Sequence, residues 1–362
     1  MQTLMHNDHM ILQAAKRPIY RRSFTKRDGR NLYLYGYQPH ELEPLSEEDF
    51  MPSKGGELRY HPLRREWNVY APHRQNRTFK PSAADDPLAP SRSGGPPTEI
   101  PFEDFELAVF ENKFTNFHER AEAPAQVDGC DTATAKGHCD VIVYGPESHG
   151  NLNRIGQDKR RLLIAAWNDR YDTLYSAGHK FVLPFENRGD EVGVTLHHPH
   201  GQIYAFPFIP NTQKAALNSF QDGYDLAAAI RGFKDKYEIL SAGGLSAFCP
   251  PFARFPFEVW IAPETFAPCP RHFDETQSDG FAYLLGEITR RYDAYFERET
   301  AYMLSLQAAP LGHEDVFHFT AQFYPLLRSK TKAKFLASVE QSTGVFTVDV
   351  MPAQAAKTLR AL

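Results

Sequence analysis

The most informative stretch of this sequence is Thr195-Leu196-His197-His198-Pro199-His200-Gly201-Gln202-Ile203-Tyr204-Ala205. It follows a predicted turn that ends at Gly189, and we expect it to form an extended strand. Residues two apart on a strand share a face, so His198, His200 and Gln202 should project together. Pro199 favours a strand end or an edge, and Gly201 lets a ligand approach the backbone closely. The pattern indicates a polar site at the end of a strand.

Three interpretations of the paired histidines are open from the residues alone. The histidines can cap loops at a polar strand end. They can bind zinc, although a structural zinc site needs four ligands and usually includes cysteines. One histidine can also act as a nucleophile, because a neutral imidazole whose Nδ1–H is held by a carbonyl presents a lone pair on Nε2. An attack on a phosphoryl group by that lone pair gives a phosphoramidate, which can pass the group onward.

The string His198-Pro199-His200-Gly201-Gln202, with Phe185-Glu186-Asn187-x-Gly189 before it, resembles the active-site motif of galactose-1-phosphate uridylyltransferases. This family belongs to the histidine-triad superfamily. The resemblance implies that His200 is the nucleophile that becomes uridylylated and that Gln202 stabilises the nucleotidyl intermediate. It also implies that the nucleotide or its phosphates contact Asn187, Thr195 and His198.

Three further passages resemble the family. Arg74 and Arg77 follow two predicted strands; arginines in such a loop lie in solvent or bind an anion, and the resemblance places them at the nucleotide phosphates. A predicted strand from Leu107 to Phe117 carries the positions that line the family's uracil pocket, Phe110 and Asn112, although Phe110 can equally be a core aromatic. The segment from Lys332 to Phe346 resembles the sugar-binding segment, with Lys334 and Glu340 near the sugar phosphate and the hexose.

We expect no metal cofactor, because the ligands of both family sites are missing. Where members carry a Cys-Pro-x-Cys-x-Gly zinc motif, the best match is Ala89-Pro90-Ser91-Arg92-Ser93-Gly94. Ser148 stands where such members supply a histidine, so His198 would be the sole ligand left. The positions that match the family's iron ligands are Ala216, Gln307, Thr320 and Gln322.

The composition is that of an ordinary globular protein of 362 residues. A formal net charge of −5 gives no general reason to expect a nucleic-acid partner. The longest apolar runs are too short to span a membrane. Four cysteines without a Cys-x-x-Cys pair suggest free thiols and a cytoplasmic location.

The order of predicted elements indicates an α+β protein made of two related halves. The resemblance implies that both halves are histidine-triad-like, each an antiparallel sheet with packed helices, in a pseudo-symmetric arrangement. The passage Pro256 to Glu264 repeats the pattern of Asp140 to Glu147, and a predicted helix follows each. Residues 1–52 are expected to form an N-terminal extension whose basic part, 16–30, is a solvated hairpin. Residues 53–212 then form the domain with the active-site motif, and 213–362 a domain with a degenerate motif.

The expected function is UMP transfer between UDP-glucose and galactose 1-phosphate through a uridylyl-histidine, by a homodimer as the resemblance implies. Two alternatives stay open. One is a nucleotide-sugar phosphorylase of the same superfamily, in which inorganic phosphate takes the nucleotide from His200. The other is a non-catalytic relative that binds nucleotide sugars.

Overall fold

The computed structural model describes residues 10–12, 17–47, 55–76, 81 and 85–362. The chain forms two compact units. The first comprises residues 1–150, 165–184 and 196–215, and the second comprises 151–164, 185–195 and 216–362. Arg77 lies outside the described residues. The chain passes between the units several times, so no single boundary in the sequence separates them.

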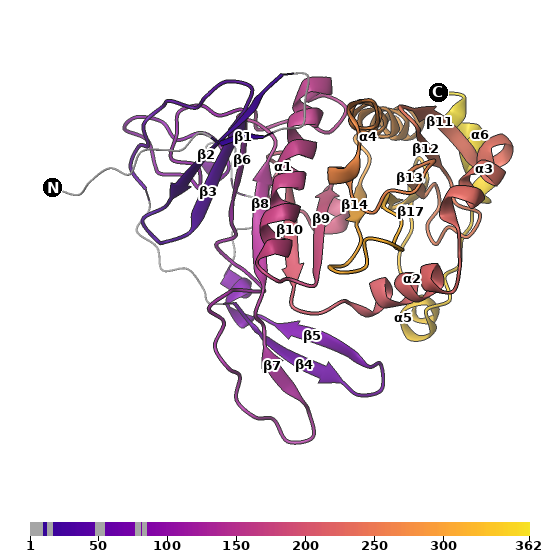
Figure 1. Cartoon of the computed structure of the whole chain (residues 1–362), viewed down its shortest axis with the longest axis horizontal. Coiled ribbons are helices and arrows are strands. Elements are labelled where there is room, and N and C mark those ends of the chain that lie inside the picture. Colours follow the sequence, from indigo (N-terminus) through magenta and orange to yellow (C-terminus); the bar gives the residue numbers. More distant parts are fainter. Residues whose placement is uncertain (1–9, 13–16, 48–54, 77–80, 82–84) are drawn as a thin grey trace. The chain divides into compact units, whose positions relative to one another are not determined.

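The main sheet of the first unit is antiparallel throughout (Figure 1). Its strand order is β1 (Met10–Leu12), β2 (Ile19–Thr25), β3 (Asn31–Gly36), β6 (Leu107–Glu111), β8 (His138–Val143) and β10 (His200–Phe206). A small second sheet holds β4 (Glu57–His61), β5 (Glu66–Tyr70) and β7 (Thr132–Thr134). The short helix η1 (Pro72–Asn76) follows β5.

The second half of helix α1 (Gly156–Ser176) covers one face of this main sheet. Arg170 donates from Nε to the carboxylate of Asp140 on β8 at 2.9 Å, and both side chains are buried. Arg21 and Tyr35, from β2 and β3, both donate to Asp169 of the same helix. The helix is therefore fixed to the sheet by charged contacts as well as by its apolar residues.

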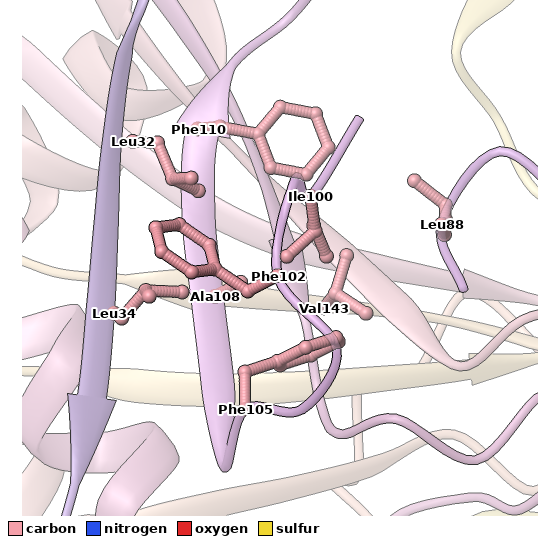
Figure 2. Close-up of a cluster of buried hydrophobic side chains, with 9 residues drawn as sticks. All are labelled: Leu32, Leu34, Leu88, Ile100, Phe102, Phe105, Ala108, Phe110 and Val143. Carbon is pink, nitrogen blue, oxygen red and sulfur yellow. The ribbon is translucent and has the colours of Figure 1, made fainter. Parts of the chain in front are cut away.

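A loop closes the opposite face of the sheet (Figure 2). Its four apolar side chains meet the apolar side chains of β3, β6 and β8 in one buried cluster: Leu88, Ile100, Phe102 and Phe105 pack on Leu32, Leu34, Ala108, Phe110 and Val143. Val143 is the register partner of His200 as well as of Ala108. The loop is thus anchored next to the first residue of β10.

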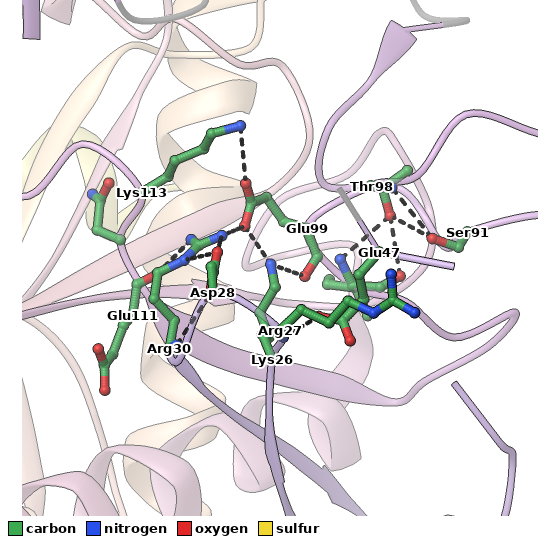
Figure 3. Close-up of polar contacts among 12 residues, drawn as sticks. Lys26, Arg27, Asp28, Arg30, Glu47, Ser91, Thr98, Glu99, Glu111 and Lys113 are labelled. Atoms are coloured by element: carbon green, nitrogen blue, oxygen red, sulfur yellow. Dashed lines mark hydrogen bonds and ion pairs between the residues drawn. The ribbon is translucent and has the colours of Figure 1, made fainter. Parts of the chain in front are cut away.

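Three basic residues of the hairpin formed by β2 and β3 are buried, namely Arg22, Lys26 and Arg30, so the prediction of a solvated hairpin was wrong for them (Figure 3). Arg27 is exposed, as predicted. Lys26 and Arg30 both pair with Glu99 of the loop, at 2.7 and 2.8 Å, and Arg30 also pairs with Asp28. Carboxylates and carbonyl oxygens compensate the loss of hydration of these cations, which the sequence pattern could not show. The pairing of β3 with β6 also places this part of residues 1–52 inside the sheet instead of in a separate extension.

The second unit has its own antiparallel strands. They run in the order β9 (Phe181–Arg188, whose last four residues belong here), β14 (Tyr302–Gln307), β15 (Thr320–Pro325), β13 (Val259–Pro263), β12 (Leu245–Phe248) and β11 (Glu238–Ala242). Helix α4 (Glu275–Phe296) packs on β11, β12 and β13, and α6 (Pro352–Arg360) packs on β11 and on α3 (Leu226–Tyr237). The remaining elements are η3 (Asp190–Val192), α2 (Asn211–Gln221), η4 (Pro270–His272), β16 (Leu327–Ser329), β17 (Lys332–Ala333) and α5 (Ser338–Thr343). The predicted α+β class with antiparallel sheets is confirmed.

Candidate active site

Strand β10 carries the central motif and begins at His200, five residues later than predicted. Pro199 has no N–H to donate to a ladder, which explains why regular pairing starts after it. Along β10 the exposure alternates: His200, Gln202 and Tyr204 are partly exposed, whereas Gly201 and Ile203 are buried. The predicted common face of His200 and Gln202 is therefore present, and it is the accessible face of the strand.

The ring of His200 is oriented by a hydrogen bond to the backbone two residues earlier. Its Nδ1 donates to the carbonyl oxygen of His198 at 2.7 Å, which leaves Nε2 as the nitrogen with the lone pair. Burial lowers the pKa of His200, and the positive charge of His198 lowers it further. The bond to the His198 carbonyl acts in the opposite direction but does not outweigh burial. His200 is thus a neutral imidazole with Nε2 available as a nucleophile.

His198 lies just before the strand, and its side chain is buried between two acceptors. Its Nδ1 lies 2.7 Å from Oδ2 of Asp86, and its Nε2 lies 2.8 Å from the carbonyl oxygen of Gly145. Burial alone would raise the pKa of Asp86, but hydrogen bonds from His198 and from the N–H of Leu88 lower it overall. The carboxylate of Asp86 is therefore ionised, and both ring nitrogens of His198 are engaged in hydrogen bonds.

Sequence reasoning missed Asp86. The segment Asp86-Pro87-Leu88-Ala89 fits the spacing Cys-Pro-x-Cys as well as Ala89-Pro90-Ser91-Arg92 does, three residues earlier. Two features of the sequence could have pointed to this segment. Pro87 follows its first residue, and Leu88 is a hydrophobic residue that enters the core. Only the structure shows that Asp86 contacts His198.

Gln202 and Tyr204 continue the accessible face beyond His200. Within the described part of the chain, the amide of Gln202 makes no hydrogen bond, so it is available to a ligand. Tyr204 accepts a hydrogen bond from Asn116 at 3.2 Å, and burial raises its pKa. Arg74 lies against the Tyr204 hydroxyl and donates to the carbonyl of Phe114. Arg74 therefore belongs to the same unit and the same face as the motif.

The two predicted uracil-pocket residues have different surroundings. Phe110 is 2% exposed in the loop-covered cluster, so its ring takes the alternative role of a core aromatic. Asn112 directly follows β6, and its Oδ1 accepts from the N–H of Phe114 at 2.8 Å. Asn112 also lines a cavity of about 330 Å³, together with Asn31, Glu111, Thr115, His118 and His138.

Four predicted site residues belong to the second unit. Asn187 lies on β9 opposite Met303, and Thr195 lies in the extended segment after η3. Lys334 and Glu340 pair with each other, and their side chains are 8% and 1% exposed, so they are less accessible than the sequence suggested. Hydrogen bonds from Lys334 and from the N–H of Ala337 lower the pKa of Glu340 to about 2.

Comparisons with known proteins agree with this geometry. Residues 46–210 match the N-terminal domain and residues 233–362 the C-terminal domain of galactose-1-phosphate uridyl transferase. The galactose-1-phosphate uridylyltransferase of Thermotoga maritima is 33% identical over 319 residues, which cover 84% of this chain and 98% of that protein. That of Haemophilus influenzae is 30% identical over 347 residues, covering 86% and 96%.

Solved structures share the fold. A structure described as a uridylyltransferase superposes with a TM-score of 0.76 at 24% identity, over 84% of this chain and 97% of that one. An ADP-glucose phosphorylase from Arabidopsis thaliana gives a TM-score of 0.66 at 21% identity, over 84% and 98%. At these identities the likeness establishes the fold alone, and the substrate has to be inferred from the residues of the site. With both family domains matched in order, the chain belongs to the galactose-1-phosphate uridyl transferase family.

Proposed function

We propose that this protein transfers UMP between UDP-glucose and galactose 1-phosphate, with His200 as the nucleophile. The observation that carries the proposal is the bond from His200 Nδ1 to the His198 carbonyl, which leaves Nε2 unprotonated on the accessible face of β10. Burial keeps the imidazole neutral by lowering its pKa. The activity carried by the names of the curated relatives supports the choice of substrates.

In the first half-reaction the lone pair of His200 Nε2 attacks the α-phosphorus of UDP-glucose. The Nε2–P bond forms as the bond from phosphorus to the glucose 1-phosphate oxygen breaks, and the electron pair leaves with glucose 1-phosphate. In the second half-reaction an oxygen of galactose 1-phosphate attacks the same phosphorus, and the Nε2–P bond breaks. Both sugar phosphates exchange as anions, so no proton has to be removed or supplied.

The positive charge that the uridylyl-imidazole acquires falls on the ring whose Nδ1–H already donates to a carbonyl. The partial negative charge of that carbonyl therefore stabilises the intermediate without rearrangement. The free amide of Gln202 is one strand repeat away, on the same face, and can donate to a phosphoryl oxygen. As a neutral group it adds no charge that would repel the incoming sugar phosphate.

The remaining contacts are proposals from the family resemblance. Arg74 and Arg77 bind the nucleotide phosphates, and Thr195 and Asn187 contact the same phosphates. Asn112 contacts the uracil. Lys334 and Glu340 act at the sugar. Arg74 lies on the same face as Tyr204, which supports its proposed role in phosphate binding. Phe110 is buried, which argues that its ring is purely structural.

The protein is further proposed to act as a cytoplasmic homodimer. All four cysteines are free, which supports a reducing compartment. Within the described residues, no helix is long and apolar enough to cross a membrane. A mass from light scattering of about twice the 41.2 kDa of one chain would support the dimer.

The decisive experiment mixes the protein with UDP-glucose and no acceptor. We expect a burst of glucose 1-phosphate equal to the number of sites, and intact mass spectrometry should show one added uridylyl group. The adduct should be acid-labile and alkali-stable, as a phosphoramidate is, and galactose 1-phosphate should remove it. His200→Asn should abolish the adduct, and the exposed neighbour His197→Asn serves as the control.

Each other outcome has a distinct meaning. An adduct that persists in His200→Asn refutes the assignment of the nucleophile. Removal of the adduct by inorganic phosphate, but not by galactose 1-phosphate, identifies a phosphorylase. If no UDP- or ADP-sugar labels the wild type, the protein is a non-catalytic binder of nucleotide sugars.

A further inference from the structure

The position where the family resemblance implies zinc is built differently in this chain. A zinc ion there would need a lone pair from His198 and three further ligands. Both ring nitrogens of His198 are already engaged, one with a carboxylate and the other with a carbonyl. In the described part of the chain, no group of three or more His, Cys, Asp or Glu side chains could hold a metal ion. The residues present therefore do not fit the metal.

Asp86 is held so that its carboxylate faces His198. Its Oδ2 receives the Nδ1–H of His198, and its Oδ1 receives the N–H of Leu88 at 3.0 Å. Leu88 is fixed in turn by its place in the buried cluster of the first unit (Figure 2). The carboxylate is thus oriented by two donors and by a core anchor, and its own side chain is only 10% exposed.

The carbonyl group of His198 connects this pair to the nucleophile. The ring of His198 is fixed at both nitrogens, and the same residue offers its backbone oxygen to His200 Nδ1. Pro199, between the two histidines, has a fixed φ and accepts a hydrogen bond from the N–H of Tyr144 at 3.1 Å. The ring contacts of His198 and the hydrogen bond to the Pro199 carbonyl hold the backbone on both sides of the His198 carbonyl, and turning that carbonyl away would break one of them.

The second unit provides an internal comparison. His318 lies two residues before Thr320 of β15, as His198 lies two residues before His200 of β10. The Nε2 of His318 also bonds to a carbonyl at the end of the neighbouring strand, that of Pro263 at 3.0 Å. Within the described residues, no carboxylate forms a hydrogen bond or ion pair with the ring of His318. The charge of Asp225 acts to raise the pKa of His318, but burial lowers it overall. The hydrogen bond from a histidine ring to a carbonyl is thus common to both units. The hydrogen bond to a carboxylate is found at His198, next to the nucleophile.

We propose that Asp86 is a positioning residue for uridylyl transfer: its carboxylate fixes the His198 ring, and thereby the carbonyl that orients His200. The kinetic consequence of this inference rests on the proposed function. Its structural content is the chain of hydrogen bonds from Leu88 through Asp86 and His198 to His200.

The substitution Asp86→Asn tests this inference with almost no change of shape. The amide can accept only on its oxygen, so one of the two donors, Leu88 N–H or His198 Nδ1–H, must face its NH₂ group. We expect the single-turnover rate of uridylylation to fall about 10- to 100-fold, the usual cost of losing an outer partner of a functional histidine. The KM for UDP-glucose should change less than threefold, since Asp86 touches no substrate. Asp85→Asn, an exposed carboxylate one residue earlier, is the matched control.

A second measurement needs no variant and no substrate. Protein labelled with ¹⁵N-histidine should show His200 protonated only on Nδ1 near neutral pH. In Asp86→Asn, His200 should become a mixture of tautomers while the melting temperature stays close to that of the wild type. A merely structural role would move the melting temperature and leave the tautomer of His200 unchanged.

The results that overturn the inference are specific. They are a wild-type rate of uridylylation in Asp86→Asn, a His200 tautomer that is the same in Asp86→Asn as in the wild type, or stoichiometric zinc bound at His198. If the wild type forms no uridylyl adduct, the proposed function fails on its own. The histidine spectra then still decide whether Asp86 fixes the His198–His200 pair.

Discussion

His200 combines two properties that rarely occur together in a side chain at a protein surface. Its ring is directed by a backbone carbonyl, so one tautomer is selected, and it is desolvated enough that the pKa falls. The first property exposes the lone pair of Nε2, and the second keeps that lone pair free of a proton near neutral pH. Neither requires a distant catalytic base. The residue is therefore ready to attack once a phosphorus is brought within reach.

The lowered pKa of His200 has a direct consequence for the pH dependence of the reaction. An ordinary imidazole is half protonated at about pH 6.5, and the protonated form cannot attack. Because the pKa of His200 is lower, the uridylylation rate at pH 6.5 should exceed half of its plateau and fall only at more acidic pH. Single-turnover bursts with UDP-glucose between about pH 5 and 8 measure this. A half-maximal rate at or above pH 6.5 would contradict the assignment.

Gln202 is expected to act on the phosphoryl oxygen. Gln202→Ala removes a neutral donor from the face of His200 and should slow uridylyl transfer by roughly 10²–10³, the usual effect of losing one oxyanion-type donor. The rate of the burst with UDP-glucose reports it, and Gln221→Ala, at an exposed position of α2, is the control. If Gln202→Ala transfers at nearly the normal rate, Gln202 is only a strand-end residue.

At the scale of elements, β8 determines where the reactive strand lies. It pairs with β10 over six residues, from His200 opposite Val143 to Ala205 opposite His138. Alternate side chains of β8 lie in two different environments, one on each face of the sheet. Val141 and Val143 face the loop-covered core, whereas His138 and Asp140 face the charged side of α1. The position of β10 therefore depends on how firmly α1 is attached to β8.

The Asp140–Arg170 pair should contribute strongly to stability. Burial alone would raise the pKa of Asp140, but Arg170 and His138 together lower it to about 2. Asp140→Asn leaves Arg170 buried without its carboxylate and should lower the free energy of unfolding by about 3–5 kcal/mol. Urea denaturation measures the change, and the exposed Asp128→Asn is the control.

The same pair predicts the direction of acid sensitivity. A carboxylate whose pKa is depressed in the folded state stabilises the protein above its unfolded pKa of about 3.9. That stabilisation is lost as the pH falls from there towards 2. The wild type should lose stability more steeply in this window than Asp140→Asn. Equal slopes would show that Asp140 does not carry the effect.

At the scale of the whole molecule, each unit contains an antiparallel sheet and a histidine that bonds to a carbonyl of the neighbouring strand. The second unit has Thr320 two residues after that histidine, and its polar side chains bond to one another. Gln322 donates to Thr320 at 2.8 Å, and Gln307 donates to Ser305 at 2.9 Å. Three of the four positions that match the family's iron ligands, Gln307, Thr320 and Gln322, thus hold side chains that form local hydrogen bonds, and the fourth is Ala216. This unit supports the fold without repeating the chemistry.

Removal of metal ions should leave the protein unaffected. Amides, a hydroxyl and a methyl group stand at the iron positions, and the ring of His198 is engaged at both nitrogens. We expect well under one zinc or iron per chain by elemental analysis and no loss of uridylyl transfer after incubation with a chelator. Stoichiometric metal, with activity lost on chelation and regained with zinc, would contradict this prediction.

The sequence alone determined the class of the fold, most of its regular elements and the identity of the reactive motif. Alternating and helical periodicities are local properties of the chain, so strands such as β8 and helices such as α1 were predictable from nearest neighbours. The motif around His200 is also local, since two histidines and a glutamine at spacing two define one face of a strand.

Only the tertiary structure decided which charged side chains are buried and what holds the histidines. Lys26 and Arg30 meet Glu99 about seventy residues later, and Asp86 meets His198 across 112 residues. Such pairings depend on which loops are folded against which face of the sheet, and no local pattern records this. A buried charge is favourable only when a specific partner replaces its water, so its role becomes visible only when both partners are in place.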